Sequence, residues 1–297
     1  MSPVPVSPGV IDQDAQGLTA GEFELIRKLA REKFGLDLRH GKEELVRARL
    51  GKLIRHGGFE SFRGYYEHVV GDRTGEALVQ MIDALTTNFT SFRREPAHFE
   101  FLAEALLPDW KNRGSVGVWS AACATGEEPY TLAFSLLEHW PAARMPAVRI
   151  LATDISTRAL AAAQKGVYPA EKLRDLPPGW LPRYFLRGQG RSEGLFRVKP
   201  DIRRLIRFGR LNLVEPFAHP EPFALILCRN VMIYFDKPVR QRVVERLEAS
   251  LEPGGYLFVG HSESLAGLKT ELVYIRPAVY RKRAADLPRA GARRGPA

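Results

Sequence analysis

The chain has 297 residues, 45% of them apolar, so it can form one large domain or two ordinary ones and is not globally disordered. No apolar run approaches the roughly 18 residues of a membrane span, and residues 1–17 lack the basic start and apolar core of a signal peptide. We expect residues 1–17 to form a disordered leader. Cys123 and Cys228 stand in no metal-type spacing, so a reduced, cytoplasmic protein without a metal is expected.

The net charge of +10 is concentrated in three windows. Residues 39–55 hold six Lys/Arg against two Glu, residues 183–210 nine against two acids, and residues 276–297 seven against one. Localised basic windows favour docking surfaces for an acidic partner. The alternative for each window is an ordinary solvated surface.

Residues 18–84 show the spacing of short amphipathic helices. In "LTAGEFELIRKLAREKFG", Thr19 stands three residues before Glu22, which predicts a capping box. "GKEELVRARLGKLIRHGG" predicts a helix with one apolar and one basic face, and "SFRGYYEHVVGD" and "GEALVQMIDALTTN" predict two more. With no strand pattern, this segment is predicted to be a small all-helical domain.

From about residue 98, apolar strands alternate with helices. "VGVWS", "VRILATD" and "FALILCRN" are each followed by a helical stretch, and "GYLFVG" comes next. This alternation predicts a Rossmann-like α/β domain with a mostly parallel sheet, which "ELVYIRP" and "VYRKR" close as an antiparallel hairpin. We assign residues 98–285 to this domain, 85–97 to a linker and 286–297 to a disordered basic tail.

Residues 183–210 interrupt the alternation with three short strand-like pieces. Gly188, Gly190 and Gly194 mark a glycine-rich turn between them. We expect a small antiparallel β-subdomain inserted on the main sheet.

The turn after the first strand contains one glycine, Gly126, and the next helix begins with Glu127 and Glu128. Phosphate-binding turns need several glycines and a helix N-terminus open to an anion. Two carboxylates there would repel a pyrophosphate and suit hydroxyl, ammonium or sulfonium groups. The next strand ends in Asp154, where an acid can accept hydrogen bonds from ribose hydroxyls. A ribose and a cation without phosphate describe S-adenosylmethionine (SAM).

The alternative is purely structural. Glu127 and Glu128 then only favour the helix dipole, and Asp154 only caps the helix that follows it.

Five stretches carry a resemblance to a known family. They are "TTNFTSFRRE" (86–95), "WSAACATGEEPYTLA" (119–133), "RLNLVEPF" (210–217), "FALILCRNVMIYFDK" (223–237) and "GHSES" (260–264). Over residues 20 to about 283 the chain resembles the chemoreceptor glutamate methyltransferase family, CheR. The resemblance implies a helical N-terminal domain, a linker that contributes to the SAM site, and a SAM-dependent methyltransferase domain with a β-subdomain.

The resemblance also implies the site residues. SAM contacts are expected from Asn88, Thr90, Arg94, Glu128, Asp154, Asn212, Leu213, Arg229 and Asn230. Tyr234 matches a tyrosine beside the transfer site and is expected to act in catalysis together with Arg94. The family usually has two phenylalanines before this arginine, whereas this chain has Phe92 and Arg93.

The implied reaction moves a methyl group from SAM to a glutamate side chain of a chemoreceptor, giving a methyl ester. A solvated glutamate is already ionised at neutral pH, so no general base is needed, and neither His98 nor His261 is expected to serve as one. Arg94 is expected to bind the methionyl carboxylate of SAM; guiding the substrate carboxylate is the alternative role. Tyr234 is expected to orient the substrate or line the methyl path.

Two surfaces are expected to bind the cytoplasmic domains of chemoreceptors. Arg49, Lys52 and Arg55 are expected to steer an acidic receptor helix bundle. The insert at 187–198 resembles the loop of family members that tether to a receptor pentapeptide. Its expected peptide-binding residues are Arg187, Gly188, Gly190, Gly194 and Arg197. No nucleic acid partner and no membrane insertion are expected.

Two other functions remain open at this point. The basic windows would suit a SAM methyltransferase acting on RNA or a small molecule. The chain could also be a non-enzymatic module that binds SAM or another nucleotide.

Overall fold

The computed structural model describes residues 17–86, 89–140 and 146–284. The chain divides into two compact units, Met1–Thr87 and Asn88–Ala297. The leader expected at residues 1–17, except Gly17, and the tail expected at 286–297 lie outside the described residues. Within the described part, no helix has both the length and the apolar character needed to cross a membrane.

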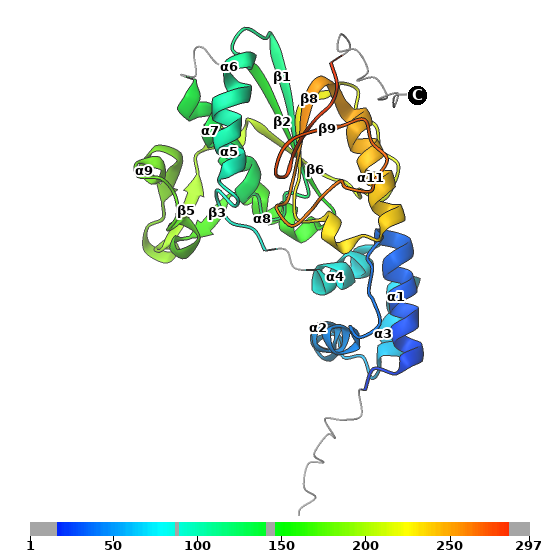
Figure 1. Cartoon of the computed structure of the whole chain (residues 1–297). Helices are drawn as coiled ribbons and strands as arrows, with labels where there is room; N and C mark the ends of the chain where they lie inside the picture. Colours follow the sequence, from blue (N-terminus) through cyan, green and yellow to red (C-terminus); the bar gives the residue numbers. More distant parts are fainter. Residues whose placement is uncertain (1–16, 87–88, 141–145, 285–297) are drawn as a thin grey trace, which may run out of the picture. The chain divides into compact units, whose positions relative to one another are not determined.

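The first unit is all-helical in its described part (Figure 1). Its helices are α1 (Ala20–Phe34), α2 (Glu43–His56), α3 (Phe62–Gly71) and α4 (Glu76–Leu85). The predicted capping box is confirmed, because the Glu22 N–H donates to Thr19 Oγ1 and the Thr19 N–H donates to the Glu22 carboxylate. Phe23, Ile26 and Leu50 are buried, so the apolar face of each helix forms the core.

The second unit contains a seven-stranded sheet with the order β6-β2-β1-β7-β8-β10-β9. The strands are β1 (Ser115–Ala121), β2 (Ala147–Asp154), β6 (Ile206–Arg210), β7 (Phe223–Cys228), β8 (Leu251–Val259), β9 (Val273–Arg276) and β10 (Val279–Arg281). The first five in space, β6 to β8, are parallel, and β10 and β9 close the sheet antiparallel. The predicted α/β fold with a closing hairpin is confirmed.

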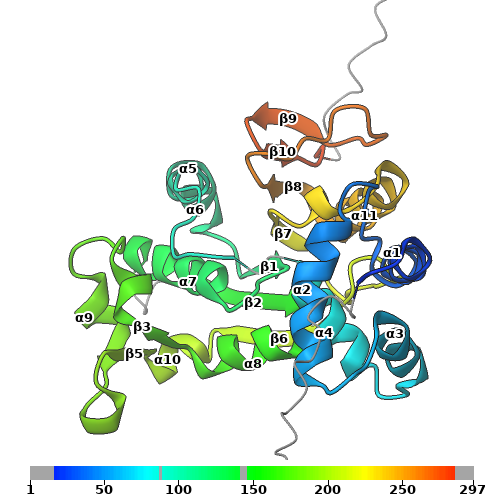
Figure 2. The same ribbon diagram turned by 90° about the horizontal axis from the view of Figure 1, so that it is seen from below.

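Helices cover both faces of this sheet (Figure 2). One core cluster joins the sheet to α7 (Glu127–His139), α8 (Thr157–Lys165) and the segment formed by α5 (Ala97–Phe101), the π-helical turn η1 (Leu102–Leu106) and α6 (Leu107–Trp110). A second cluster joins the opposite face to α11 (Lys237–Ser250). The apolar side chains of β1 and β7 therefore serve two cores, which explains their nearly continuous apolar sequence.

A separate three-stranded antiparallel sheet has the order β3-β5-β4. Its elements are β3 (Val167–Pro169), η3 (Ala170–Leu173), α9 (Trp180–Tyr184), β4 (Phe185–Arg187), η4 (Gly190–Ser192), β5 (Leu195–Val198) and α10 (Pro200–Arg203). The insert predicted at 183–210 needs correction at both ends. Residues 206–210 pair with β2 in the main sheet, and residues 167–169 join the small sheet.

The linker residues 89–97 pack onto the second unit. Phe92 is buried among Phe134, Tyr168 and Phe185. The Arg93 N–H donates to Thr131 Oγ1 of α7 (3.1 Å), which fixes the chain just before Arg94.

Gly126 precedes α7 with φ +96°, and a Cβ there would lie 2.8 Å from Ala163 Cβ and 3.0 Å from the Tyr168 hydroxyl oxygen. Gly179 has a similar φ of +89° but open space around the same position. We expect Gly126→Ala to lower the free energy of unfolding by roughly 2–5 kcal/mol, and Gly179→Ala by about 1–2 kcal/mol, because only the first adds a clash to the backbone strain. Urea unfolding of both variants measures the difference; equal losses would show that the close approach at Gly126 costs nothing.

Candidate cofactor and methyl-transfer site

The candidate site lies at the carboxyl ends of β1, β2, β6 and β7. In open α/β sheets the loops at this edge form the ligand crevice. Five non-glycine residues near this edge have left-handed backbones, namely Arg93, Glu95, Ala122, Ala124 and Asn230, with φ between 47° and 80°. Such conformations are costly for side chains with a Cβ and collect where a ligand dictates the backbone.

The turn after β1 is held by Asp154 at the end of β2. Asp154 Oδ2 accepts the N–H of Ala124 (2.8 Å), and Oδ1 accepts the N–H of Ser156 (2.9 Å). The Thr153 carbonyl accepts the N–H groups of Ala122 and Cys123. Asp154 therefore positions the turn after β1 through both of its carboxylate oxygens. Ser156, rather than Asp154, caps α8.

The two acids at the start of α7 point to different partners. Glu127 forms an ion pair with Lys172 of η3 and accepts the Thr125 hydroxyl (2.7 Å). Glu128 accepts the Ser120 hydroxyl through Oε1 (2.7 Å) and Arg229 Nη1 through Oε2 (2.8 Å). Burial raises the pKa of the Glu128 carboxyl, and the nearby guanidinium opposes that shift. Only Glu128 belongs to the candidate site.

Arg229 connects three segments of the site. It is 6% exposed, and besides Glu128 its guanidinium donates to Glu95 Oε2 (3.0 Å from Nη2) and to the Arg94 carbonyl. The chain thus ties β7, the linker and α7 together through one cation. Arg229 is also predicted to contact SAM; in the described structure its guanidinium holds the linker, β7 and α7 together.

The linker residues lie around this network. Asn88 lies outside the described residues, and Thr90 is half-buried. Arg94 Nη1 donates to the Phe89 carbonyl (2.9 Å), with the guanidinium over the Phe89 ring. Arg93 places its guanidinium 5.8 Å from the centre of the Trp180 ring. This cation–π contact accounts for an arginine where the family usually has phenylalanine.

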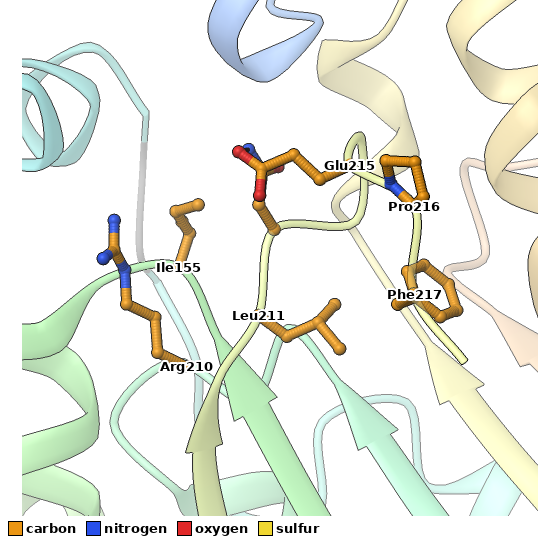
Figure 3. Close-up of a pocket in the computed structure, with 7 residues that line it drawn as sticks. Ile155, Arg210, Leu211, Glu215, Pro216 and Phe217 are labelled. Carbon is orange, nitrogen blue, oxygen red and sulfur yellow. Dashed lines mark hydrogen bonds between the residues drawn. The ribbon is translucent and has the colours of Figure 1, made fainter. Parts of the chain in front are cut away.

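A pocket of about 400 Å³ opens between Ile155, the residue after Asp154 in the chain, and Phe217 (Figure 3). Leu211 lies between these two side chains, and Arg210, Asn212, Glu215 and Pro216 complete the lining. Asn212 Nδ2 donates to Glu215 Oε1 (3.1 Å), while Leu213 is buried in the adjacent core. The residues predicted to flank adenine are therefore at or next to a real cavity.

The loop after β7 carries the other predicted residues. Asn230 Nδ2 donates to Glu95 Oε1 (3.2 Å), and half-buried Tyr234 ends the 3-10 turn η5 (Met232–Tyr234). Asn230 and Arg229 thus both depend on Glu95.

Of the described histidines near this loop, His98 is a weak base. Burial and the Arg229 guanidinium lower the pKa of His98 to about 3, so its imidazole is neutral at physiological pH. Ligand atoms of Glu95, His98 and His261 lie within 4.8 Å of one another. The Glu95 carboxylate accepts Arg229, Asn230 and the His261 N–H, whereas both ring nitrogens of buried His98 are without a hydrogen-bond partner among the described residues.

The predicted partner-binding residues lie elsewhere. Lys52 and Arg55 are exposed on α2, but half-buried Arg49 donates to the Leu85 carbonyl at the end of α4 (2.5 Å). Arg187 ends β4, at the edge of the small sheet, and Arg197 lies on its central strand β5. Gly188, Gly190 and Gly194 lie in the connection between these strands.

Sequence reasoning missed three residues, Glu95, Ser120 and Glu263. Glu95 sits at the end of the "TTNFTSFRRE" stretch and Glu263 inside "GHSES", so both lay within motifs that were noted without a role. Their importance follows only from contacts with Arg229, Asn230 and neighbouring backbone.

The sheet order, its antiparallel closure and an acidic, glycine-poor cofactor edge define a SAM-dependent methyltransferase. Two family models match the chain: "CheR methyltransferase, SAM binding domain" at residues 88–280 and "CheR methyltransferase, all-alpha domain" at residues 21–86. The chain belongs to the CheR methyltransferase family.

Curated relatives agree with this assignment. The chain is 36% identical to the "Chemotaxis protein methyltransferase" of Borreliella burgdorferi, covering 89% of this chain and 95% of the relative. It is 40% identical to "Chemotaxis protein methyltransferase 2" of Pseudomonas aeruginosa, covering 83% and 87%. It is 37% identical to the "Chemotaxis protein methyltransferase" of Escherichia coli, covering 89% and 91%.

Replacing Arg229 by a neutral residue should strongly destabilise the fold, because it leaves buried carboxylates unpaired. We expect Arg229→Met to lower the free energy of unfolding by about 3–5 kcal/mol. Adding Glu128→Gln should restore part of this loss, since the amide carries no charge. A double-mutant cycle by urea unfolding measures the coupling, and purely additive losses would show that the pair is not linked.

Proposed function

We propose that this protein transfers the methyl group of SAM to glutamate side chains of chemoreceptors, forming γ-glutamyl methyl esters on their cytoplasmic domains. The observation that carries the proposal is the cofactor edge. It offers Asp154 and an Arg229–Glu128 pair where a phosphate-binding turn would offer open N–H groups. Membership of the CheR family and the names of the relatives support chemoreceptors as the substrate class.

The described residues fit SAM in chemical type. Asp154 supplies carboxylate lone pairs for ribose hydroxyls at the end of β2. The pocket near the end of β2, with Asn212 and the neighbouring Leu213, is proposed to take adenine because its lining combines apolar side chains with the Asn212 amide and the charged Arg210 and Glu215. Arg94 supplies a cation for the methionyl carboxylate. Thr90, Asn88, Glu128 and Asn230 are proposed to complete the cofactor site.

When bound, SAM would supply a methyl group on a sulfonium centre, which a carboxylate oxygen can take by direct substitution: the O–CH3 bond forms as the S–CH3 bond breaks, and S-adenosylhomocysteine leaves as the neutral thioether. The substrate glutamate is already ionised at neutral pH. His98 is neutral, so it places no positive charge against the attacking carboxylate. Opposite charges cancel as the ester forms, so a water-poor site favours reaction. The residues of this chain therefore act by alignment and exclusion of water.

Arg94 and Tyr234 are the proposed catalytic residues. A cation held tightly against the attacking carboxylate would stabilise the ground state and slow transfer, which argues for Arg94 on the methionyl group. Tyr234, on the loop after β7, orients the substrate or lines the methyl path.

The proposed reaction can be tested with SAM labelled in its methyl group and chemoreceptor-rich membranes from the source organism. We expect label in receptor bands that mild base releases as volatile methanol, because esters hydrolyse and methylated nitrogen does not. Label that stays on the protein after base would assign a different acceptor, and no label would refute the proposal.

Asp154→Ala tests the cofactor site in a separate binding measurement. We expect it to weaken binding of S-adenosylhomocysteine about tenfold to hundredfold, the usual loss for a charged hydrogen-bond acceptor. Calorimetry measures the affinity, and Asp201→Ala, which changes an exposed acid on α10, serves as the control. Unchanged affinity in a folded Asp154→Ala protein would remove Asp154 from the site.

The exposed end of the basic face of α2 is proposed to steer the acidic receptor. Lys52→Glu/Arg55→Glu should raise the apparent KM for receptor at low salt without changing SAM affinity. Surface charges steer the approach of the receptor, and salt screens this effect. Arg49→Glu should instead destabilise the helical unit, since Arg49 bonds the Leu85 carbonyl. A receptor KM that stays constant in the double variant would assign these charges to plain solvated surface.

The small sheet is proposed to bind the C-terminal pentapeptide of tethering receptors along its edge strand β4 by main-chain hydrogen bonds. Strand pairing puts Arg197 opposite Leu186 and Val167, all exposed on one face, whereas Arg187 is opposite Phe196. An acidic side chain of the peptide would therefore meet Arg197 beside apolar surface.

Titration with an acidic, aromatic-containing pentapeptide tests this proposal. Arg197→Ala should weaken binding more than Arg187→Ala, because the two arginines belong to opposite faces of the sheet. Absence of binding to the wild type at sub-millimolar peptide would end the tethering proposal and leave the methyltransferase proposal standing.

A further inference from the structure

Glu263, in the segment after β8, is a buried carboxylate that backbone N–H groups surround. It is 8% exposed. Its Oε2 accepts the N–H groups of Asn230 (2.8 Å) and Gly260 (2.6 Å), and its Oε1 accepts the N–H of Ile233 (3.2 Å). Burial raises the pKa of its carboxyl, and these hydrogen bonds oppose the rise. The charge is thus met by main chain rather than by a lysine or arginine.

The N–H groups at Asn230 and Ile233 belong to the loop that carries the proposed transfer residues. Asn230 has a left-handed backbone (φ 58°), and Ile233 is the middle residue of η5, directly before Tyr234. The two oxygens of Glu263 therefore fix the two ends of one short loop. Oε2 fixes the end next to Arg229, and Oε1 fixes the end next to Tyr234.

The loop after β7 packs closely against Gly260. A Cβ at Gly260 would lie 2.4 Å from Asn230 Nδ2 and 2.8 Å from Glu263 Oε2. On its other side the loop is held by Glu95, which accepts the Asn230 and Arg229 side chains. Glu95 accepts side chains of the loop, whereas Glu263 accepts its backbone N–H groups, including that of Ile233 next to Tyr234.

We propose that Glu263 is a positioning residue for methyl transfer, which sets the place of Tyr234 through the Ile233 N–H and the place of Asn230 through its own N–H. This inference rests on the proposed function. The proposal predicts separate effects on methyl transfer and on cofactor binding. The Tyr234 end of the loop would affect transfer, and the Arg229–Asn230 end would affect the cofactor site.

Glu263→Gln distinguishes the two ends. A glutamine has one acceptor oxygen, which should keep the two short bonds to Asn230 and Gly260, and its amide NH2 then faces the Ile233 N–H, where donor meets donor. We expect kcat for receptor methylation to fall about tenfold to hundredfold. Affinity for S-adenosylhomocysteine should stay within about threefold of wild type, because the cofactor end keeps its bonds.

Glu252→Gln is the matched control. Glu252, on β8, bonds Arg113 and lies outside the loop, so the same loss of one carboxylate should leave both kcat and affinity unchanged. Glu263→Asp is the second variant if Glu263→Gln does not fold. It keeps the charge but is one methylene shorter, so it too should lower kcat more than affinity.

Each outcome decides the inference. A fall in kcat with retained affinity for S-adenosylhomocysteine supports positioning, whether or not the two facing donors lower the melting temperature. Wild-type kcat in Glu263→Gln overturns it, as does a parallel loss of kcat, affinity and melting temperature, which would mean a structural role only. A wild-type enzyme without methyl transfer would instead refute the proposed function, so the two failures are distinguishable.

Discussion

The cofactor edge depends on one buried cation. Arg229 binds Glu128 of α7, Glu95 of the linker and the Arg94 carbonyl, so three segments far apart in sequence meet at one guanidinium. A planar group with five fixed donors can satisfy several acceptors at defined angles, which a lysine cannot. Burial acts to raise the pKa of both carboxyls, and the Arg229 guanidinium opposes that rise; the net pKa lies below the ordinary value for Glu95 and above it for Glu128. Everything else at the edge, from the turn held by Asp154 to the loop held by Glu263, is arranged around this centre.

Much of the fold follows from pattern. Alternating apolar strands and helices led to the sheet, and the capping box at Thr19 led to the start of α1, because both signals are local or periodic. The small sheet was harder to predict. Residues 206–210 have an ordinary strand sequence, and nothing local says whether they pair with β2 or with β5. Residues 167–169 are too short for a period-two pattern, so their membership of the small sheet depends on pairing at long range.

The site divides in the same way. Glu128 and Asp154 could be predicted from the sequence, because the carboxyl ends of parallel strands share one edge of the sheet. Glu127 looked equivalent to Glu128, and only the position of Lys172 on the small subdomain separates them. Glu95 and Glu263 each bond the loop after β7 from at least 30 residues away, through side-chain directions that no spacing reveals. Likewise the sequence alone does not distinguish Arg49 from a surface charge, because its bond to the Leu85 carbonyl joins residues that are 36 positions apart.

The left-handed residues around the site have a consequence for the life of the protein in a cell. Arg93, Glu95, Ala122, Ala124 and Asn230 each hold backbone strain, of the order of 1–3 kcal/mol per residue, against a total folding free energy of only about 5–15 kcal/mol. This strain reduces the margin of folding free energy, and a bound cofactor or product would add to that margin by mass action. Degradation samples the opened chain, so the abundance of this protein should follow the supply of its cofactor. A cell short of methyl donor would then lose the enzyme as well as its activity.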